Sequence, residues 1–298
     1  MQEGSDSLSQ GSSRGSTRRV GAGGIRFPIV SLLLLFAACG GSEGTLLGAE
    51  GCSGCPEIAI PGDLERTLLP DALDVTVVGR VTDAQGAGTW RLRNDGLPLV
   101  MEGGIHQRDE GFSLSLPALA GESLLEISFA NDRGTARFSI RLLQEKTQHR
   151  DIRVLLTWDN PLSDLDLHLL RPGGTLGGDG DCYWGTCSPA SAGGEANPPD
   201  WGVAGDSQDD PTNDLEAHEG FGPESIVLDG AERGDYQIVV TNFGDAQQGP
   251  SGADVTVLLE ERTAGTFHRR IPADHDAVVP VAVVSWPAAT VRGIEERE

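Results

Sequence analysis

The 298-residue chain contains little of what a helical protein or a nucleic-acid-binding protein needs. No stretch of useful length shows the apolar spacing of a helix, while 41 glycines and 17 prolines indicate many turns. Lys and Arg number 22 against 45 Asp and Glu, for a formal net charge of −23. Phosphate groups would be repelled by such a surface, which excludes nucleic acid as a partner.

Signatures of common enzymes are also missing. The sequence has no Gly-x-Ser-x-Gly elbow and no phosphate-binding loop, and His218-Glu219 lacks the second histidine of a zinc protease. The six histidines form no cluster with ligand spacing. We therefore expect a protein that is not an enzyme.

Long hydrophobic runs are absent except near the start. The dozen residues 27–38 are apolar or small, follow Arg26 and end at Cys39. Such a run is too short to span a bilayer and is typical of a signal-peptide core. The segment Phe36-Ala37-Ala38-Cys39 resembles the lipobox of bacterial lipoproteins. That resemblance implies cleavage after residue 38 and acylation of Cys39, with palmitate among the acyl groups.

The leader also defines the mature chain and its compartment. Residues 1–38 carry four arginines and two acids, so their removal leaves about −25 on the mature chain. Gly40, rather than aspartate, follows the cysteine, which in the resembled family implies the outer membrane. We expect an exported protein held to the cell envelope by its lipid, with the membrane as its first partner.

Four cysteines remain after Cys39 is set aside, in two close pairs. In an oxidising compartment these pairs predict the local disulfides Cys52–Cys55 and Cys182–Cys187. A four-cysteine zinc site and a redox role for Cys52 and Cys55 are less favoured alternatives.

Residues 39–69 are rich in glycine and small residues and predict the lipidated cysteine followed by a flexible linker. Residues 70–146 then alternate apolar and polar positions between Gly/Asp turns, which predicts an antiparallel β-sandwich. The alternating sets are Val75, Val77, Val81; Trp90, Leu92; Phe112, Leu114, Leu116; Leu125, Ile127, Phe129; and Ala136, Phe138, Ile140, Leu142.

Parts of this segment resemble bacterial Ig-like accessory domains, which space or present other domains. The residues that carry the resemblance are Val77-Val78-Gly79-Arg80-Val81-Thr82-Asp83, Gly111–Leu116, Gly121–Ile127 and Ala130–Gly134.

Residues 151–298 predict a second, acidic β-sandwich of jelly-roll type, interrupted by a long loop over 173–222. The fold class expected for the chain is therefore all-β: two antiparallel sandwiches after a cleaved signal peptide and a tether. A loop of about fifty residues is uncommon unless it has a function or is held in place.

Carboxylates gather in and around that loop, with fourteen acids and one arginine between positions 159 and 224. Crowded carboxylates repel one another unless they are solvated, protonated or bridged by a cation, and hard oxygen ligands suit Ca²⁺. Asp164 and Asp166 alternate with leucines and would project from one face of a strand. We predict a Ca²⁺ site whose ligands are Asp164, Asp166, Asp210, Asp214 and Glu224; a solvated acidic loop is the alternative.

The second segment resembles a β-sandwich domain of secreted bacterial proteins whose function is largely unknown. The resemblance implies the sandwich and supports calcium. It is carried by Trp158-Asp159-x4-Asp164-Leu165-Asp166-Leu167-His168-Leu169, by Gly220-Phe221-Gly222-Pro223-Glu224, and by Gly234-Asp235-Tyr236.

Trp184 and Trp201 stand out in the glycine-rich loop, since only 5% of the residues are aromatic. They are candidate contacts for a protein or polysaccharide ligand, or they cover a small core of the loop. The function expected is a membrane-anchored, non-catalytic binding or structural module. The alternatives are a secreted carboxylate-dependent hydrolase and a polysaccharide-binding lipoprotein.

Overall fold

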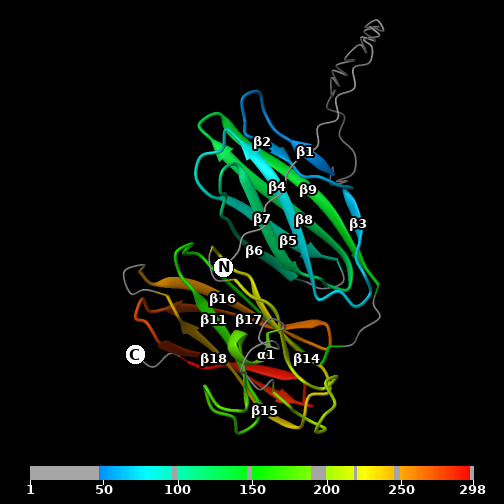
Figure 1. Ribbon diagram of the computed structural model, residues 1–298, viewed down its shortest axis with the longest axis vertical. Helices are drawn as coiled ribbons and strands as arrows, with labels where there is room; N and C mark the ends of the chain where they lie inside the picture. The colour runs from blue at the N-terminus through cyan, green and yellow to red at the C-terminus, as the bar shows by residue number, and fades with distance from the viewer. Residues whose placement is uncertain are drawn as a thin grey trace, which may run out of the picture. The chain divides into compact units, whose positions relative to one another are not determined.

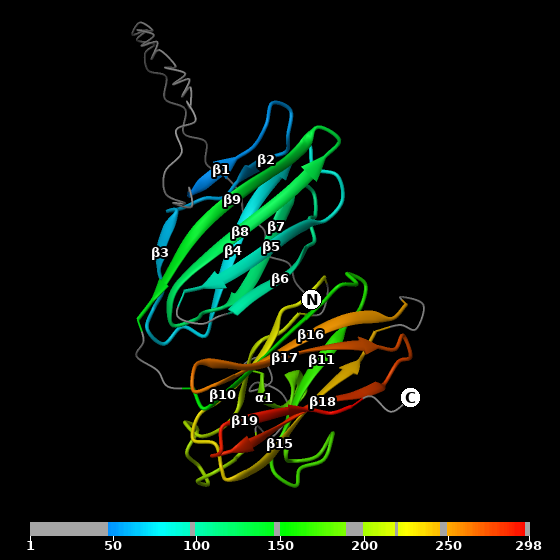
Figure 2. The same cartoon turned by 180° about the vertical axis from the view of Figure 1, so that it is seen from behind.

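The computed structural model describes residues 47–95, 99–145, 150–188, 199–217, 220–244 and 249–295. Cys39 and the leader lie outside the described residues. Residues Thr45–Glu298 form one compact unit that is nearly all β-strand (Figures 1 and 2), which confirms the all-β fold class. Within the described ranges, no helix is long and apolar enough to cross a membrane.

The first sandwich packs a six-stranded sheet against a three-stranded sheet. The six-stranded sheet has the order β1-β9-β8-β5-β6, with β3 also paired to β9, and the three-stranded sheet has the order β2-β4-β7. The strands are β1 Gly48–Glu50, β2 Glu57–Ala59, β3 Glu65–Thr67, β4 Asp74–Thr82, β5 Gly88–Asn94, β6 Leu99–Ile105, β7 Gly111–Pro117, β8 Gly121–Asn131 and β9 Gly134–Gln144.

The apolar residues of the predicted alternation form the core of this sandwich. Along β5, Trp90 and Leu92 are buried, whereas the alternate residues Thr89 and Arg91 are exposed. Trp90 pairs with Ile127 and Leu92 with Leu125, so one face of the six-stranded sheet is continuously apolar. Burial of that face provides the main driving force for folding.

The segment 39–69, predicted as a flexible linker, contributes three short strands to this sandwich from residue 48 onward. β1 and β2 pair antiparallel with β9 and β4, and β3 pairs with β9 in parallel. Ile58 is buried, and the Cys52–Cys55 disulfide packs against the β8–β9 turn, where a Cβ on Gly134 would lie 2.9 Å from both sulfurs. Strands of three residues are too short to show a period, so the glycine-rich composition was misleading here.

The second sandwich packs two five-stranded sheets. One, which we call the β10 sheet, has the order β13-β14-β10-β16-β17, and the other, the β15 sheet, has the order β12-β11-β15-β18-β19. The elements are β10 Ile152–Trp158, β11 Leu165–Leu170, β12 Asp181–Cys182, α1 Trp184–Cys187, β13 Thr212–Leu215, β14 Glu224–Leu228, β15 Gly234–Asn242, β16 Ser251–Leu259, β17 Arg262–Ile271, β18 Ala277–Trp286 and β19 Thr290–Gly293.

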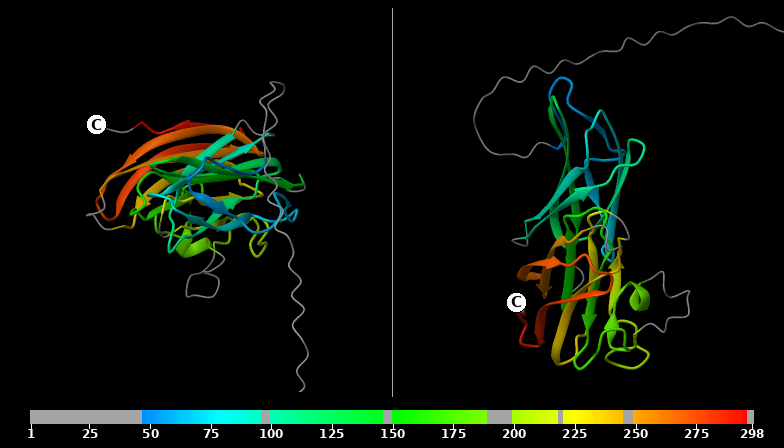
Figure 3. Two further views of the ribbon diagram at one scale, coloured as in Figure 1. Left: turned by 90° about the horizontal axis from the view of Figure 1, so that it is seen from above. Right: turned by 90° about the vertical axis from the view of Figure 1, so that its left-hand side faces the viewer.

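The predicted long loop, 173–222, is partly structured. It contributes β12 and β13 to the edges of the two sheets and holds the short helix α1 between Cys182 and Cys187. Figure 3 shows α1 on the outside of the second sandwich. Both predicted disulfides, Cys52–Cys55 and Cys182–Cys187, are present.

Candidate functional site

The outer face of the β10 sheet joins the second sandwich to the first. Every residue of β10 is buried, because one face packs in the core of its own sandwich and the other faces the first sandwich. On that outer face, Leu155 and Leu258 belong to the same apolar cluster as the core of the first sandwich. β10 is therefore buried on both faces, for a different reason at each.

We call this contact between the two sandwiches the joint. Arg153, two residues before Leu155, forms the polar part of the joint. Its guanidinium donates to the carbonyl oxygens of Ala118 (2.7 Å) and Leu73 (2.8 Å) in the first sandwich. It also donates to Asp214 Oδ2 at 2.7 Å and to Ser225 Oγ at 3.2 Å in its own sandwich. The guanidinium has an acceptor for each of its three nitrogens, and its removal would leave the Asp214 carboxylate without its cation and the Ala118 carbonyl without the guanidinium donor.

Further along the same face the two sandwiches part to form a cleft of about 620 Å³. On the outer face of β10, Arg153 and Leu155 lie in the joint, and Thr157, the next residue on that face, lines the cleft. The register pairs Thr157 with Asp254 of β16, which also lines the cleft. One strand face thus contains both the joint and one wall of the cleft.

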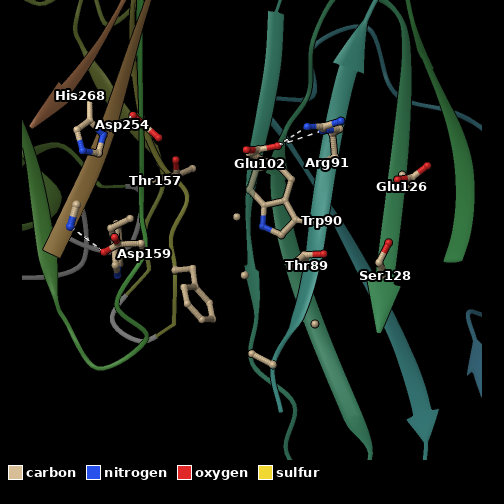
Figure 4. A pocket seen from close by; sticks show the side chains of 17 residues that line it. Thr89, Trp90, Arg91, Glu102, Glu126, Ser128, Thr157, Asp159, Asp254 and His268 are labelled. Atoms are coloured by element: carbon tan, nitrogen blue, oxygen red, sulfur yellow. Dashed lines mark hydrogen bonds and ion pairs between the residues drawn. The ribbon is translucent and has the colours of Figure 1, made fainter. Parts of the chain in front are cut away.

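The opposite wall is the outer face of the six-stranded sheet. There Arg91 pairs in register with Glu102 on one side and Glu126 on the other, while Thr89 pairs with Gly104 and Ser128. Figure 4 shows this wall facing Thr157, Asp159, Asp254 and His268 of the second sandwich.

Phe221 closes one part of the cleft against the first sandwich. A Cβ on Gly104 would lie 2.1 Å from the Phe221 ring, so the glycine is needed for this approach. The Phe221 carbonyl accepts from the Trp158 backbone N–H at 3.2 Å, which fixes the loop before β14 to the end of β10.

Acceptors dominate the charged groups of the cleft. Its lining holds the four carboxylates of Glu102, Glu126, Asp159 and Asp254 against the guanidinium of Arg91 and the imidazole of His268. Arg91 donates to Glu102 at 2.8 Å, His268 Nδ1 lies 3.0 Å from Asp254 Oδ1, and Asp159 Oδ1 accepts from the Gly252 N–H at 2.7 Å. Just outside the lining, Arg137 lies 4.0 Å from Glu126.

Two buried indole groups border the cleft without a hydrogen-bond partner. Trp90 and Trp158 line the cleft and are 1% and 3% exposed, and within the described structure neither Nε1–H has an acceptor. A Cβ on Gly103, another lining residue, would lie 2.7 Å from Trp90 Nε1. A buried donor without an acceptor costs about 1–3 kcal/mol, but both rings pack in the cores of their own sandwiches, out of reach of a ligand in the cleft.

The structure brings together only part of the predicted calcium set. Asp164, Asp166 and Glu224 lie in one electrostatic neighbourhood of the second sandwich, and Glu216, which the prediction did not include, belongs with them. Glu224 Oε2 accepts from the Leu167 N–H at 2.7 Å, and so links β14 of one sheet to β11 of the other.

Burial is the main cause of the raised pKa values of Asp166 and Glu224. It raises the pKa of Asp166 to about 6, with the charge of Asp164 adding to the rise and His168 and the Trp184 hydrogen bond opposing it. Burial, and then the charge of Asp166, raise the pKa of Glu224 well above its usual value. Asp166 therefore keeps its proton up to about pH 6, and Glu224 keeps its proton to a higher pH than an ordinary glutamate does.

Asp210 and Asp214 lie elsewhere. Asp210 Oδ1 accepts from the Trp201 backbone N–H at 2.7 Å in the acidic loop, and burial raises its pKa. Asp214 belongs to the joint with Arg153, and burial raises its pKa although the guanidinium opposes this. Across the described ranges, no group of three or more His, Cys, Asp or Glu side chains is arranged to hold a metal ion.

The two candidate tryptophans have different environments. Trp201 is 2% exposed and packs at 6.1 Å from Tyr236 in the core, so its ring has no face for a ligand and it covers the core instead. Trp184 is half-buried and lies edge-on to Phe243, with ring centroids 6.2 Å apart; Phe243 in turn lies 5.6 Å from His275. Only Trp184 still borders an accessible surface.

His168, two residues after Asp166 on β11, is held by hydrogen bonds to residues outside the predicted calcium set. Its Nδ1 lies 3.0 Å from both carboxylate oxygens of Asp181, and its Nε2 lies 3.1 Å from Thr241 Oγ1. Its ring stacks on Tyr183 at 4.8 Å, so the disulfide-closed turn covers it.

The sequence did not identify the joint or the cleft. Arg153 is a single basic residue inside an apolar strand, and that exception is the signal that was available. The cleft's two walls come from segments that are about 30 residues or more apart, and no local pattern places them together.

No protein-family model and no curated protein matches this chain. Among solved structures, it is similar to a chimeric titin Z1Z2 carrying a KLER peptide from decorin, at 13% identity and a TM-score of 0.23, with 63% of this chain and 89% of that chain covered. It is also similar to titin domains Z1Z2 in complex with telethonin, at 14% identity and a TM-score of 0.22, with 70% and 97% covered. These scores are low, and the β-sandwich architecture stands on the sheets described above.

Proposed function

We propose that this chain is a lipid-anchored, non-catalytic binding and structural module of the bacterial cell envelope, with the cleft between its sandwiches as the binding site. The observation that carries the proposal is the Arg153 joint beside the cleft. Because one guanidinium donates two hydrogen bonds to the first sandwich and two within its own, the cleft walls are held in place before a ligand arrives. Preorganisation of this kind lowers the entropic cost of binding.

The placement of the carboxyls with raised pKa supports a non-catalytic role. Of the four carboxyls with raised pKa, Asp166, Asp214 and Glu224 are 6% exposed or less and lie within the second sandwich or the joint, while Asp210 lies in the acidic loop, outside the lining of the cleft. A catalytic acid needs its proton within hydrogen-bond reach of a substrate. The carboxylates that do line the cleft are paired with neighbouring groups or with the backbone.

Anchoring is tested by labelling cells with a palmitate analogue and by fractionating their envelopes. The wild-type chain is expected to carry the label and to sediment with membranes, whereas Cys39→Ser is expected to lose both. A labelled Cys39→Ser chain, or an unlabelled wild type, would overturn the anchor.

The hydrolase alternative is tested with a panel of glycoside and peptide substrates. Turnover that is lost in Asp166→Asn while the fold is kept would overturn the non-catalytic role. We expect the wild-type chain to show no more turnover than the Asp166→Asn chain.

One observation favours polysaccharide binding as a second candidate function. Phe243 is 52% exposed and lies between Trp184 and His275, so that the three rings form an aromatic row on the second sandwich. Aromatic faces of this kind stack on sugar rings. Binding on a glycan array that is lost in both Trp184→Ala and Phe243→Ala would support this function, and retention would exclude the row as its site.

A further inference from the structure

We infer that the cleft between the sandwiches binds a short segment of a neutral polysaccharide. This inference rests on the proposed binding function and names the class of ligand. It combines three features of the cleft: the pairing of its charged groups, the hydroxyl groups of its lining, and its volume. It places the sugar in the cleft and not on the aromatic row of the second sandwich.

The charged groups of the first-sandwich wall form a donor–acceptor pair. Arg91 Nε and Nη2 both donate to Oε2 of Glu102, at 3.1 and 2.8 Å. A guanidinium carries more N–H donors, and a carboxylate more acceptor positions, than these two bonds use. The two side chains are 44% and 63% exposed, so a ligand in the cleft can bond to both of them without separating the pair.

The second-sandwich wall repeats this arrangement. Asp254 of β16 pairs in register with His268 of β17, and His268 Nδ1 lies 3.0 Å from Asp254 Oδ1. Gly252 lets Asp159 approach the same place, since a Cβ on the glycine would lie 2.8 Å from Asp159 Oδ2 and 3.2 Å from His268 Cε1. An imidazole and two carboxylates thus lie together on this wall and face the Arg91 wall (Figure 4).

A lining of paired charges favours a neutral ligand that carries hydroxyl groups. A hydroxyl both donates and accepts, so one hydroxyl can accept from Arg91 while it donates to Glu102. A sugar ring offers several hydroxyls and leaves the ion pairs intact. A charged ligand would instead compete with an ion pair for one of its members, and an anion would also be repelled by the excess of carboxylates in the lining.

Uncharged groups of the lining add to this match. Thr89 and Ser128 pair in register on the first wall, and Thr157 lies on the second. Their hydroxyls can bond to either a donor or an acceptor of the ligand. The Phe221 ring supplies an apolar surface, against which the C–H groups of a sugar would be removed from water.

The volume fits about two or three sugar rings, because about 620 Å³ is in the range of sites that hold small-molecule ligands. The cleft is open to solvent on the side of Asp254 and His268, which are 55% and 71% exposed. A longer polysaccharide can therefore place a short segment in the cleft and leave the rest of its chain in water.

The test is calorimetric titration of the full chain carrying Cys39→Ser with the neutral trisaccharides maltotriose, cellotriose and triacetylchitotriose. Trigalacturonate is the acidic comparison probe. At least one neutral trisaccharide is expected to bind, and its affinity is expected to change less than about twofold between about 50 and about 500 mM salt, because no net charge is neutralised. Trigalacturonate is expected not to bind.

Paired variants locate the bound sugar. Arg91→Met with Glu102→Met removes a donor–acceptor pair of the lining at constant net charge, while Arg80→Met with Glu110→Met removes an exposed ion pair outside the cleft. The first double variant is expected to weaken binding of the trisaccharide about tenfold, because the hydrogen bonds from its hydroxyls to two charged groups are lost. The second is expected to weaken binding less than about twofold.

Equal affinities of the two double variants, or no binding of any neutral trisaccharide, would overturn the inference. Binding that is lost in Phe243→Ala but kept in the Arg91 and Glu102 double variant would assign the sugar to the aromatic row, and would overturn it as well.

Peptides of alternating lysine and glycine, and of alternating glutamate and glycine, are titrated in parallel to separate this inference from the proposed function. A peptide that binds the wild type but not the Arg91 and Glu102 double variant, where no sugar binds, would overturn the sugar class and keep the cleft as a binding site. No binding of any probe would count against both. Anchoring is read separately by palmitate labelling.

Discussion

The carboxylate of Asp214 lies 2.7 Å from the guanidinium of Arg153, and the two side chains are 0% and 4% exposed. The same guanidinium reaches two backbone carbonyls of the first sandwich. One buried ion pair on the outer face of the β10 sheet thus takes part in the attachment of the second sandwich to the first.

Replacing Arg153 with alanine is therefore expected to destabilise the chain strongly. The change leaves Asp214 buried without its partner and costs about 3–5 kcal/mol of unfolding free energy, measured by urea denaturation. The control is Arg80→Ala, which breaks an exposed pair with Glu110 at 3.2 Å and is expected to cost less than about 1 kcal/mol. Similar losses from the two variants would contradict the role given to the joint.

Stability is expected to fall as pH rises from about 4 to above 6. The pKa of Asp166 is about 6 in the folded chain and about 3.9 when unfolded, so between these values the folded state binds more protons. The contribution is fully present below the unfolded pKa and is lost as pH rises through the folded pKa. The loss is about 3 kcal/mol, and the raised pKa of Glu224 acts in the same direction.

The measurement is the free energy of unfolding across this pH range for the wild type, Asp166→Asn and the exposed control Asp276→Asn. Asp166→Asn is expected to show a flatter profile, and Asp276→Asn the wild-type profile. A wild-type slope in Asp166→Asn would assign the pH dependence to other groups.

The calcium proposal now makes a narrower prediction. Among the five proposed ligands, only Asp164, Asp166 and Glu224 share a neighbourhood. Millimolar Ca²⁺ is expected to raise the melting temperature reversibly, because a ligand that binds only the folded state stabilises it. Asp164→Ala and Asp166→Ala are expected to abolish the shift and Asp210→Asn to keep it. No shift in the wild type, or one that survives both alanine changes, would end the proposal.

Much of the fold could be predicted from the sequence, because alternating residues bury one face of each strand. The sets around Leu92, Leu116, Ile127 and Ile140 are strands, as expected. The short strands β1–β3 could not be predicted, since three residues show no period.

The site was harder to predict for a related reason. Asp164 and Asp166 are electrostatic neighbours, but Asp210 and Asp214 are separated from them by tertiary contacts that residue type does not reveal. Asp214 is an acid among many in sequence, and only the fold gives it Arg153 as a partner.

The central claim is that the two sandwiches form one preorganised unit across the Arg153 joint. It is tested most directly by the spin-label distance between Val78→Cys and Val278→Cys, two half-exposed positions on different sandwiches, in the chain carrying Cys39→Ser. The account predicts one narrow distance distribution that broadens when Arg153 is replaced by alanine. A broad distribution in the chain that retains Arg153 would contradict it.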